Sequence, residues 1–310
     1  MAHYNIAMHL LRLRQPRDQE GAIRHLNAAL RRVTPEAQRD EVYLQAFLRN
    51  GVALAYSQLG RLQEAASLLG EARALLEPFE DDDRARIEKA TFLYNWAQLA
   101  LMEGDLRSAL ERLDRVQEVE PHLGYYWVER GNWLFQTEDY RASLEAYRRA
   151  LITSVPNESL LFNMAVCWEQ LGEEARAADG YEEVLRRYPG NADAVQAVTE
   201  LLLLAGEHKR LVDMVAPLVD ALESADCFSN YALAMQELGE TERAVEYFKR
   251  ALAAQPQHVN AMVNLAAVRF DQGDVREAET LLRQALQIDP SHEVALSNLG
   301  YLEGAAGASA

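Results

Sequence analysis

Apolar residues recur at helical spacing along most of the chain, in segments separated by short polar turns. In one such segment Leu161, Met164, Ala165 and Trp168 lie three or four residues apart, so they fall on one side of a helix. Gly and Pro are sparse among the 310 residues, at 16 and 9, which favours helix over strand. The pattern predicts an all-α protein.

The helical pattern repeats with a period of 34 residues, and the segment 230–256 superimposes on 264–290 at that shift. Turn positions inside successive units are spaced by 44, 34, 34, 34, 33 and 34 residues: Gly60, Gly104, Glu138, Gly172, Gly206, Gly239 and Gly273. The residues that open the second helix are mostly small and keep the same spacing: Ala65, Ala109, Ser143, Ala177, Leu211, Ala244 and Ala278. Proline closes several units: Pro121, Pro156, Pro189, Pro256 and Pro290. Three series in register indicate a repeat array.

Each feature of the unit has a physical reason. A small residue lets two helix backbones approach closely, Gly tolerates a tight turn, and Pro ends a helix because it has no N–H to donate. The unit resembles the tetratricopeptide repeat, a 34-residue helix–turn–helix with small residues where its helices cross. The resemblance covers nearly the whole chain. It implies an all-α, right-handed superhelical solenoid of about eight hairpins followed by a single helix.

The expected organisation has three parts. Residues 1–80 hold two longer or degenerate repeats, whose helices include segments at about 3–14 and 36–57. Residues 81–292 form the regular array, with units at about 82–123, 124–157, 158–190, 191–224, 225–258 and 259–292. A capping helix follows at 293–306, started by Ser291, and 307–310 is a tail.

The unit 191–224 departs most from the pattern, because Leu211 replaces the small residue at the crossing and Pro217 lies within the second helix. A proline there should kink the helix. Two readings stay open: a bend in the array, or a degenerate repeat that packs normally. The final helix is likewise either a natural cap or part of a longer array.

The chain carries a net charge of −17, which is unevenly spread. Residues 1–80 hold 10 basic and 9 acidic side chains, residues 81–190 hold 13 and 21, and residues 191–310 hold 8 and 18. So acidic a surface should repel nucleic acids and anionic membranes. The excess of acidic side chains either keeps the array soluble or, in the C-terminal part, binds a basic partner.

Other functional classes leave no signature. No apolar run approaches the roughly 18 residues of a membrane span, and no signal peptide is recognisable, so no direct membrane insertion is expected. Cys167 and Cys227 lack metal or redox spacing, which suits core residues in a reducing, cytoplasmic compartment. No phosphate-binding loop, serine-hydrolase elbow or zinc-protease motif occurs. We therefore expect no catalytic activity, no cofactor and no metal.

The resemblance also implies where a partner lies. In this family the first helices line the concave face of the superhelix, and the sixth residue of each unit points into that groove. Here the series reads Asn95, Glu129, Asn163, Gln196, Asn230, Asn264 and Asn298. An amide both donates and accepts hydrogen bonds, which suits the backbone of an extended peptide, and some relatives use an Asn ladder in this way. The alternative is that these amides are only solvated.

Neighbouring groove positions suggest the character of the partner. The carboxylate clamp of chaperone-binding relatives fits poorly, since the chain has only three lysines. Polar and acidic side chains beside the amides favour a basic segment: Glu169, Gln236, Glu237 and Asp271. Nearer the middle of the chain the groove wall is more aromatic, with Tyr94, Tyr125, Asn132 and Phe135.

The sequence thus predicts a scaffold or adaptor, without enzymatic activity, that binds a protein or peptide in the concave groove. Two alternatives remain. The chain is a homo-oligomeric scaffold assembled by stacking of repeats, or it is the repeat region of a larger regulatory or enzyme-associated protein.

Overall fold

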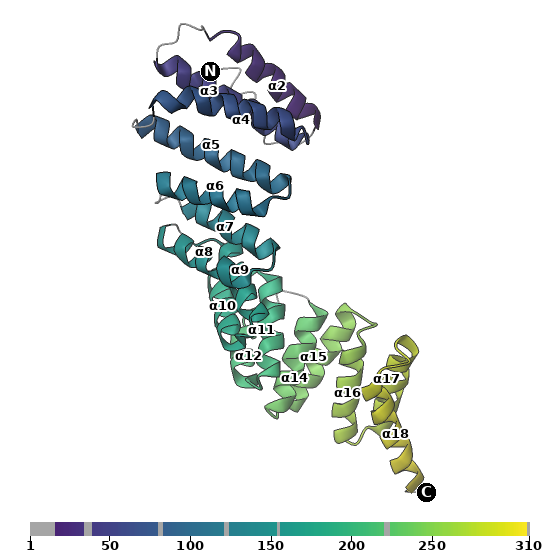
Figure 1. Cartoon of the computed structure of the whole chain (residues 1–310). Coiled ribbons are helices and arrows are strands. Elements are labelled where there is room, and N and C mark those ends of the chain that lie inside the picture. Colours follow the sequence, from purple (N-terminus) through teal and green to yellow (C-terminus); the bar gives the residue numbers. More distant parts are fainter. Residues whose placement is uncertain are drawn as a thin grey trace. The chain divides into compact units, whose positions relative to one another are not determined.

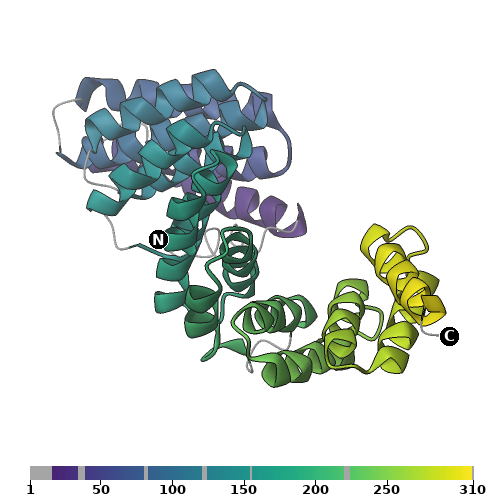
Figure 2. The same cartoon turned by 90° about the horizontal axis from the view of Figure 1, so that it is seen from below.

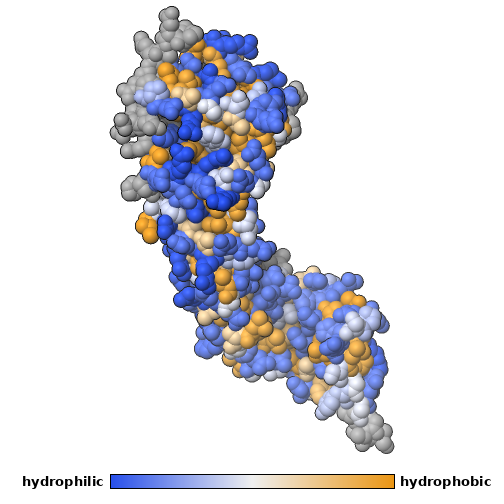
Figure 3. All heavy atoms as spheres, in the orientation of Figure 1, coloured by the Kyte–Doolittle hydropathy of each residue, from blue (hydrophilic) through white to orange (hydrophobic). Residues whose placement is uncertain are grey.

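The computed structural model describes residues 16–33, 39–79, 83–120, 124–153, 156–219 and 224–308. These ranges form sixteen α-helices and one short 3₁₀ helix, without a strand (Figure 1). The all-α fold class is confirmed, and the helix expected at 3–14 lies outside the described residues. No helix within the described ranges has the length and apolar character to cross a membrane. Hydrophilic residues cover much of the visible surface, with smaller apolar patches between them (Figure 3).

The chain divides into two compact units, Met1–Pro156 and Asn157–Ala310. In the first unit α2 packs on α3, and three hairpins follow, α3 with α4, α5 with α6 and α7 with α8. The bounds of these elements are α2 Pro16–Leu30, α3 Arg39–Gln58, α4 Leu62–Leu76, η1 Glu77–Phe79, α5 Asp83–Met102, α6 Leu106–Val119, α7 Gly124–Gln136 and α8 Tyr140–Thr153.

The second unit holds four hairpins, α9 with α10, α11 with α12, α14 with α15 and α16 with α17, and α18 packs on α17 (Figure 2). Its helices are α9 Glu158–Gln170, α10 Glu174–Arg187, α11 Ala192–Leu204, α12 His208–Val215, α14 Ala225–Glu237, α15 Thr241–Ala254, α16 Val259–Asp271, α17 Val275–Ile288 and α18 Glu293–Ala308. The first helices α11, α14, α16 and α18 contact one another in succession. We call the side formed by the first helices of a unit its first-helix face.

One residue with a left-handed backbone joins the two helices of each hairpin. Six of these positions are glycines with φ between 70° and 84°, whereas Glu138 holds the same place with φ 62°. The next residue donates its N–H to the carbonyl five residues earlier, as Glu173 does to Trp168 at 2.8 Å. This bond ends the first helix and lets the second begin at once.

The residues predicted at the crossings are all fully buried, at 0% exposure: Ala65, Ala109, Ser143, Ala177, Leu211, Ala244 and Ala278. Large side chains such as Tyr181 and Phe248 fill the core beside them. Ser143 adds a hydrogen bond from its hydroxyl to the Gly131 carbonyl at 2.8 Å. Cys167 and Cys227 are also buried in this core.

Two local expectations change. The second helix of the 191–224 unit ends at Val215 after 8 residues rather than kinking at Pro217, whose missing N–H prevents the helix from continuing. The start of α18 is capped by His292, whose Nδ1 accepts the Ala295 N–H at 3.2 Å. Ser291 instead hydrogen-bonds Asp289, through its hydroxyl at 2.8 Å.

The turn at Glu138 generates a stability prediction. A side chain in the left-handed region costs about 1–2 kcal/mol, while glycine costs roughly 0.5–1 kcal/mol through the freedom of the unfolded chain. Glu138→Gly should therefore raise the free energy of unfolding by about 0.5–1 kcal/mol. The matched control, Gly172→Ala, should lower it. Urea unfolding followed by circular dichroism measures both, and a less stable Glu138→Gly protein would contradict the argument.

The division into units generates a second prediction. Because contacts in a repeat array are local, residues 157–310 should fold without the first unit. The fragment should show a helical circular dichroism spectrum and a cooperative thermal transition. A fragment lacking either would show that the second unit needs the first.

Candidate functional site

The first-helix face of the second unit contains a hollow of about 300 Å³. Two amides of the predicted ladder, Asn230 on α14 and Asn264 on α16, line it together. Two carboxylates also face it, Glu200 from α11 and Asp226 from α14. The hollow therefore joins groups that can bind a peptide backbone to groups that can bind a cation.

Two histidines of the hollow also have structural roles. His258 is only 8% exposed; its Nδ1 accepts the Ala261 N–H at 3.1 Å, and its Nε2 lies 3.0 Å from Asp226 Oδ1. Since Nδ1 is an acceptor, the proton is on Nε2 and is donated to Asp226. His292 repeats the arrangement on α18, with Nε2 lying 3.2 Å from Asn260 Oδ1.

These histidines belong to a series of helix caps that sequence reasoning missed. The cap of every first helix in the second unit accepts a backbone N–H three residues ahead, and the series is Asn157, Asn191, Ser224, His258 and His292. Asn191 also donates to Glu158 of the preceding repeat at 2.9 Å. Three of the caps thus begin a helix and bond to the preceding repeat. The caps recur every 33 or 34 residues, but the sequence did not reveal them as a series because the residue type changes from Asn to Ser to His.

The ladder amides differ in how they are engaged. Asn230 Nδ2 donates to Thr199 Oγ1 at a long 3.3 Å, and the exposed Gln196 donates to Glu200 at 3.1 Å. Asn163 also has an interaction. Asn264 and Asn298 are partly exposed, and their side chains make no hydrogen bond to a residue that the structure describes. Of these two amides, Asn264 lines the 300 Å³ hollow, so it is the amide best placed to bind a partner there.

The other predicted residues of this unit do not gather in one place. Glu169 accepts a hydrogen bond from the Tyr181 hydroxyl at 2.5 Å, and Glu237 is exposed near the turn. Gln236 has a buried side-chain oxygen without a partner among the described residues. Asp271 and Asn298 line a separate hollow of about 210 Å³.

The first-helix face of the first unit has different chemistry. Asn95 on α5 donates to Asn50 on α3 at 2.8 Å, and Asn50 is 6% exposed, so this amide ties two repeats together. Asn132 accepts a hydrogen bond from the Tyr147 hydroxyl at 2.8 Å. Phe135 packs edge-on against Tyr140, with ring centroids 5.6 Å apart.

Aromatic rings gather around Tyr94 on this face. The Tyr94 and Tyr125 hydroxyl oxygens lie 2.8 Å apart, and Gln98 Nε2 donates to Tyr94 at 2.7 Å. Burial raises the pKa of the Glu129 carboxyl, although the polar groups of Tyr94, Asn132 and Trp133 act in the opposite direction. Burial likewise raises the pKa of Tyr94. Tyr94 is thus the centre of a small polar network on this face.

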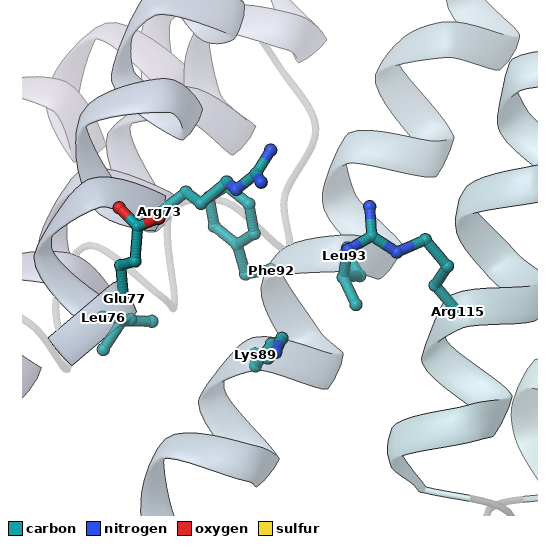
Figure 4. Close-up of a pocket in the computed structure, with 7 residues that line it drawn as sticks. All are labelled: Arg73, Leu76, Glu77, Lys89, Phe92, Leu93 and Arg115. Carbon is teal, nitrogen blue, oxygen red and sulfur yellow. The ribbon is translucent and has the colours of Figure 1, made fainter. Parts of the chain in front are cut away.

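A small pocket of the first unit lies between α4, α5 and α6 (Figure 4). Arg73 and Arg115 extend from opposite sides toward Phe92 and Leu93. The pocket holds about 50 Å³, room for one or two water molecules. The described residues also contain no group of three His, Cys, Asp or Glu side chains placed to bind a metal ion.

Two curated proteins are similar to parts of the chain. One is an N-terminal acetyltransferase A complex subunit-like protein of Schizosaccharomyces pombe, 27% identical over 117 residues, which are 38% of this chain and 17% of that protein. The other is a TPR repeat-containing protein of Methanocaldococcus jannaschii, 22% identical over 181 residues, with coverage of 55% and 32%. The chain thus spans less than a third of the length of either relative.

Solved structures of similar fold include MamA from Desulfovibrio magneticus, with 16% identity, a TM-score of 0.48 and coverage of 55% of this chain and 97% of that one. Another is YrrB, described as a TPR protein with an unusual peptide-binding site, with 17% identity, a TM-score of 0.37 and coverage of 72% and 97%.

Family profiles match the repeats directly. One tetratricopeptide repeat profile matches residues 94–159 and 128–192, and a second matches 235–302. Together they cover slightly more than half of the chain, with α6 to α10 and α15 to α17 in full and α5, α14 and α18 in part. With hairpins, turns and crossings as described, the chain belongs to the tetratricopeptide repeat family.

Proposed function

We propose that this chain is a protein-interaction scaffold that holds an extended segment of a partner on the first-helix face of its second unit. Tetratricopeptide repeats support protein–protein interaction and are generally non-enzymatic. The observation that carries the proposal is the hollow in which Asn264 lies without a hydrogen-bond partner among the described residues.

The chemistry of the hollow suits a peptide backbone. The Asn264 amide can donate to a backbone carbonyl and accept from a backbone N–H, which makes two bonds with one residue of an extended segment. Asn230 lies in the same hollow, and its long bond to Thr199 is weak enough to exchange for a partner. Each such bond contributes about 0.5–1.5 kcal/mol net.

The charge of the second unit favours a basic segment. Glu200 and Asp226 face the hollow, and residues 191–310 carry 18 acidic against 8 basic side chains. A lysine or arginine of the bound segment would meet these carboxylates, and the surrounding field would speed its association at low salt.

A second copy of the chain is the alternative partner. The last helix, α18, buries Ala295 and Leu302 but leaves Val294, Leu296 and Tyr301 at least half exposed. Exposed apolar side chains on one helix favour self-association. Leu296→Asp should then disperse an oligomer seen by light scattering, while a chain that is monomeric at high concentration would contradict this alternative.

Two asparagine substitutions test the amide ladder. One removes an amide that we propose binds the partner, and the other removes an amide that ties two repeats together. A peptide selected from a displayed random library against residues 157–310 serves as the probe, and calorimetry measures its affinity for the full chain. Asn264→Ala should weaken binding by about 1–3 kcal/mol, roughly 5- to 150-fold, because two hydrogen bonds are lost. Its melting temperature should not change, since no internal bond is broken.

Asn95→Ala is the matched control. The substitution leaves the buried Asn50 oxygen without its hydrogen bond, so it should lower the free energy of unfolding by about 1–3 kcal/mol. It should not weaken the binding of the peptide. If Asn264→Ala binds the peptide as tightly as the unmodified chain, the amide ladder does not hold the partner.

A further inference from the structure

We propose that the first unit binds an acidic side chain, aspartate or glutamate, of a protein partner in the pocket between α4, α5 and α6 (Figure 4). The groups that bind it are the guanidinium groups of Arg73 on α4 and Arg115 on α6. Both arginines lie on second helices, so the site is distinct from the amide ladder, whose members lie on first helices. The inference rests on the proposed function only in that the acidic group belongs to a protein.

The pocket has an excess of positive charge. Arg73, Lys89 and Arg115 line it together with a single carboxylate, Glu77. Lys89 already has an interaction of its own, so the proposal depends on the two arginines. The hollow of about 300 Å³ in the second unit has instead two carboxylates and no lysine or arginine. In a chain with a net charge of −17, a pocket of the opposite sign favours a negatively charged ligand.

The two arginines are available to a ligand. Arg73 and Arg115 are exposed, and neither forms an ion pair with a residue that the structure describes. A hollow of about 680 Å³ in the second unit also has three cations, but each of them pairs with a carboxylate: Arg186, Lys209 and Arg210. Basic side chains in this chain therefore usually have an acidic partner within the fold, and the two arginines of the small pocket do not.

A further arginine increases the positive charge beside the pocket. Arg112 Cζ lies 5.1 Å from the centroid of the Trp96 ring, and Arg73 Cζ lies 5.9 Å from the same ring. The ring attracts both guanidinium groups but does not neutralise their charge. Two cations held against one ring repel each other, and a bound carboxylate would reduce this repulsion.

The size and the apolar base of the pocket suit a carboxylate. A volume of about 50 Å³ is enough for this group and too small for a nucleotide. The base consists of Leu76, Phe92 and Leu93, which are at most 7% exposed and limit the access of water. Arg73 and Arg115 extend toward this base from opposite sides, so a carboxylate between them can accept hydrogen bonds from both (Figure 4).

The alternative is that the arginines only cover the apolar base with their aliphatic stems. Such a role predicts a contribution to stability but no preference for charge in solution. An anion site predicts that a negatively charged probe binds better than a neutral probe of nearly the same shape. This difference can be measured without knowing the natural partner.

The test titrates the full chain with two blocked tripeptides, Gly-Glu-Gly and Gly-Gln-Gly, while NMR follows the side-chain Nε–H signals of nitrogen-15-labelled arginines. Glutamine has nearly the shape of glutamate but no charge. We expect the glutamate peptide to shift the Arg73 and Arg115 signals with a dissociation constant in the roughly millimolar range. The glutamine peptide should bind at least about tenfold more weakly.

Arg115→Gln removes one of the two charges, so it should weaken the glutamate peptide about tenfold, as measured at the Arg73 signal. Arg141→Gln is the matched control, because Arg141 is an exposed arginine of α8 in the same unit, has no ion pair with a described residue and does not line the pocket. It should leave the affinity unchanged. Circular dichroism checks that both variants fold. If Arg115→Gln does not fold, Arg73→Gln should produce the same loss at the Arg115 signal.

Equal affinity for the glutamate and glutamine peptides would overturn the proposal, and so would a folded Arg115→Gln protein that binds glutamate as well as the unmodified chain. A blocked Gly-phosphoserine-Gly peptide that shifts the two signals when the glutamate peptide does not would also overturn it, since the ligand would then be a phosphoryl group. Asn264→Ala separates this inference from the proposed function. It should leave the glutamate titration unchanged, whatever it does to the selected peptide.

Discussion

Every hairpin in this chain depends on one residue that the backbone holds in a left-handed conformation between two helices. Its successor closes the first helix through a bond to the carbonyl five residues earlier, and it also opens the second helix. So short a connection leaves the helices antiparallel and in contact, which requires a small or tightly packed residue where they cross, such as Ala177. The first helices then stack on one another, and this stacking creates the faces that carry the candidate sites.

The fold could be predicted because its requirements recur at a fixed period. Left-handed turns favour glycine and crossings favour alanine, so both series are visible, and even Glu138 was placed correctly by spacing. The sites were harder to predict, because they depend on side chains that only the stacking of repeats brings together. Asn95 acquires its role from Asn50, 45 residues earlier, and the sequence showed it only as a member of the amide ladder. Likewise, a Cβ on Gly131 would lie 2.4 Å from the Tyr147 ring, a constraint set by packing rather than by local pattern.

The two units show how one fold supports different surface chemistry. The sixth residue of each repeat is not one of the crossing residues, so the hairpin does not dictate its identity. In the second unit this position is an amide in every repeat; in the first it is Asn95, which ties repeats together, and the carboxylate Glu129. The position can therefore change from an amide that ties repeats together to an amide open to a partner or to a half-buried carboxylate, while the turns and crossings remain the same.

The two histidine caps give the hollow in the second unit a further property. His258 and His292 line it, and each also holds the first turn of a helix and bonds to the repeat before it. A bound peptide that contacts these rings therefore changes how readily the first turns of α16 and α18 open. Binding in the hollow and opening of these first turns are then thermodynamically linked, because each disfavours the other by the same coupling free energy. The slowing of amide exchange at the first turns of both helices would report the strength of binding from inside the fold.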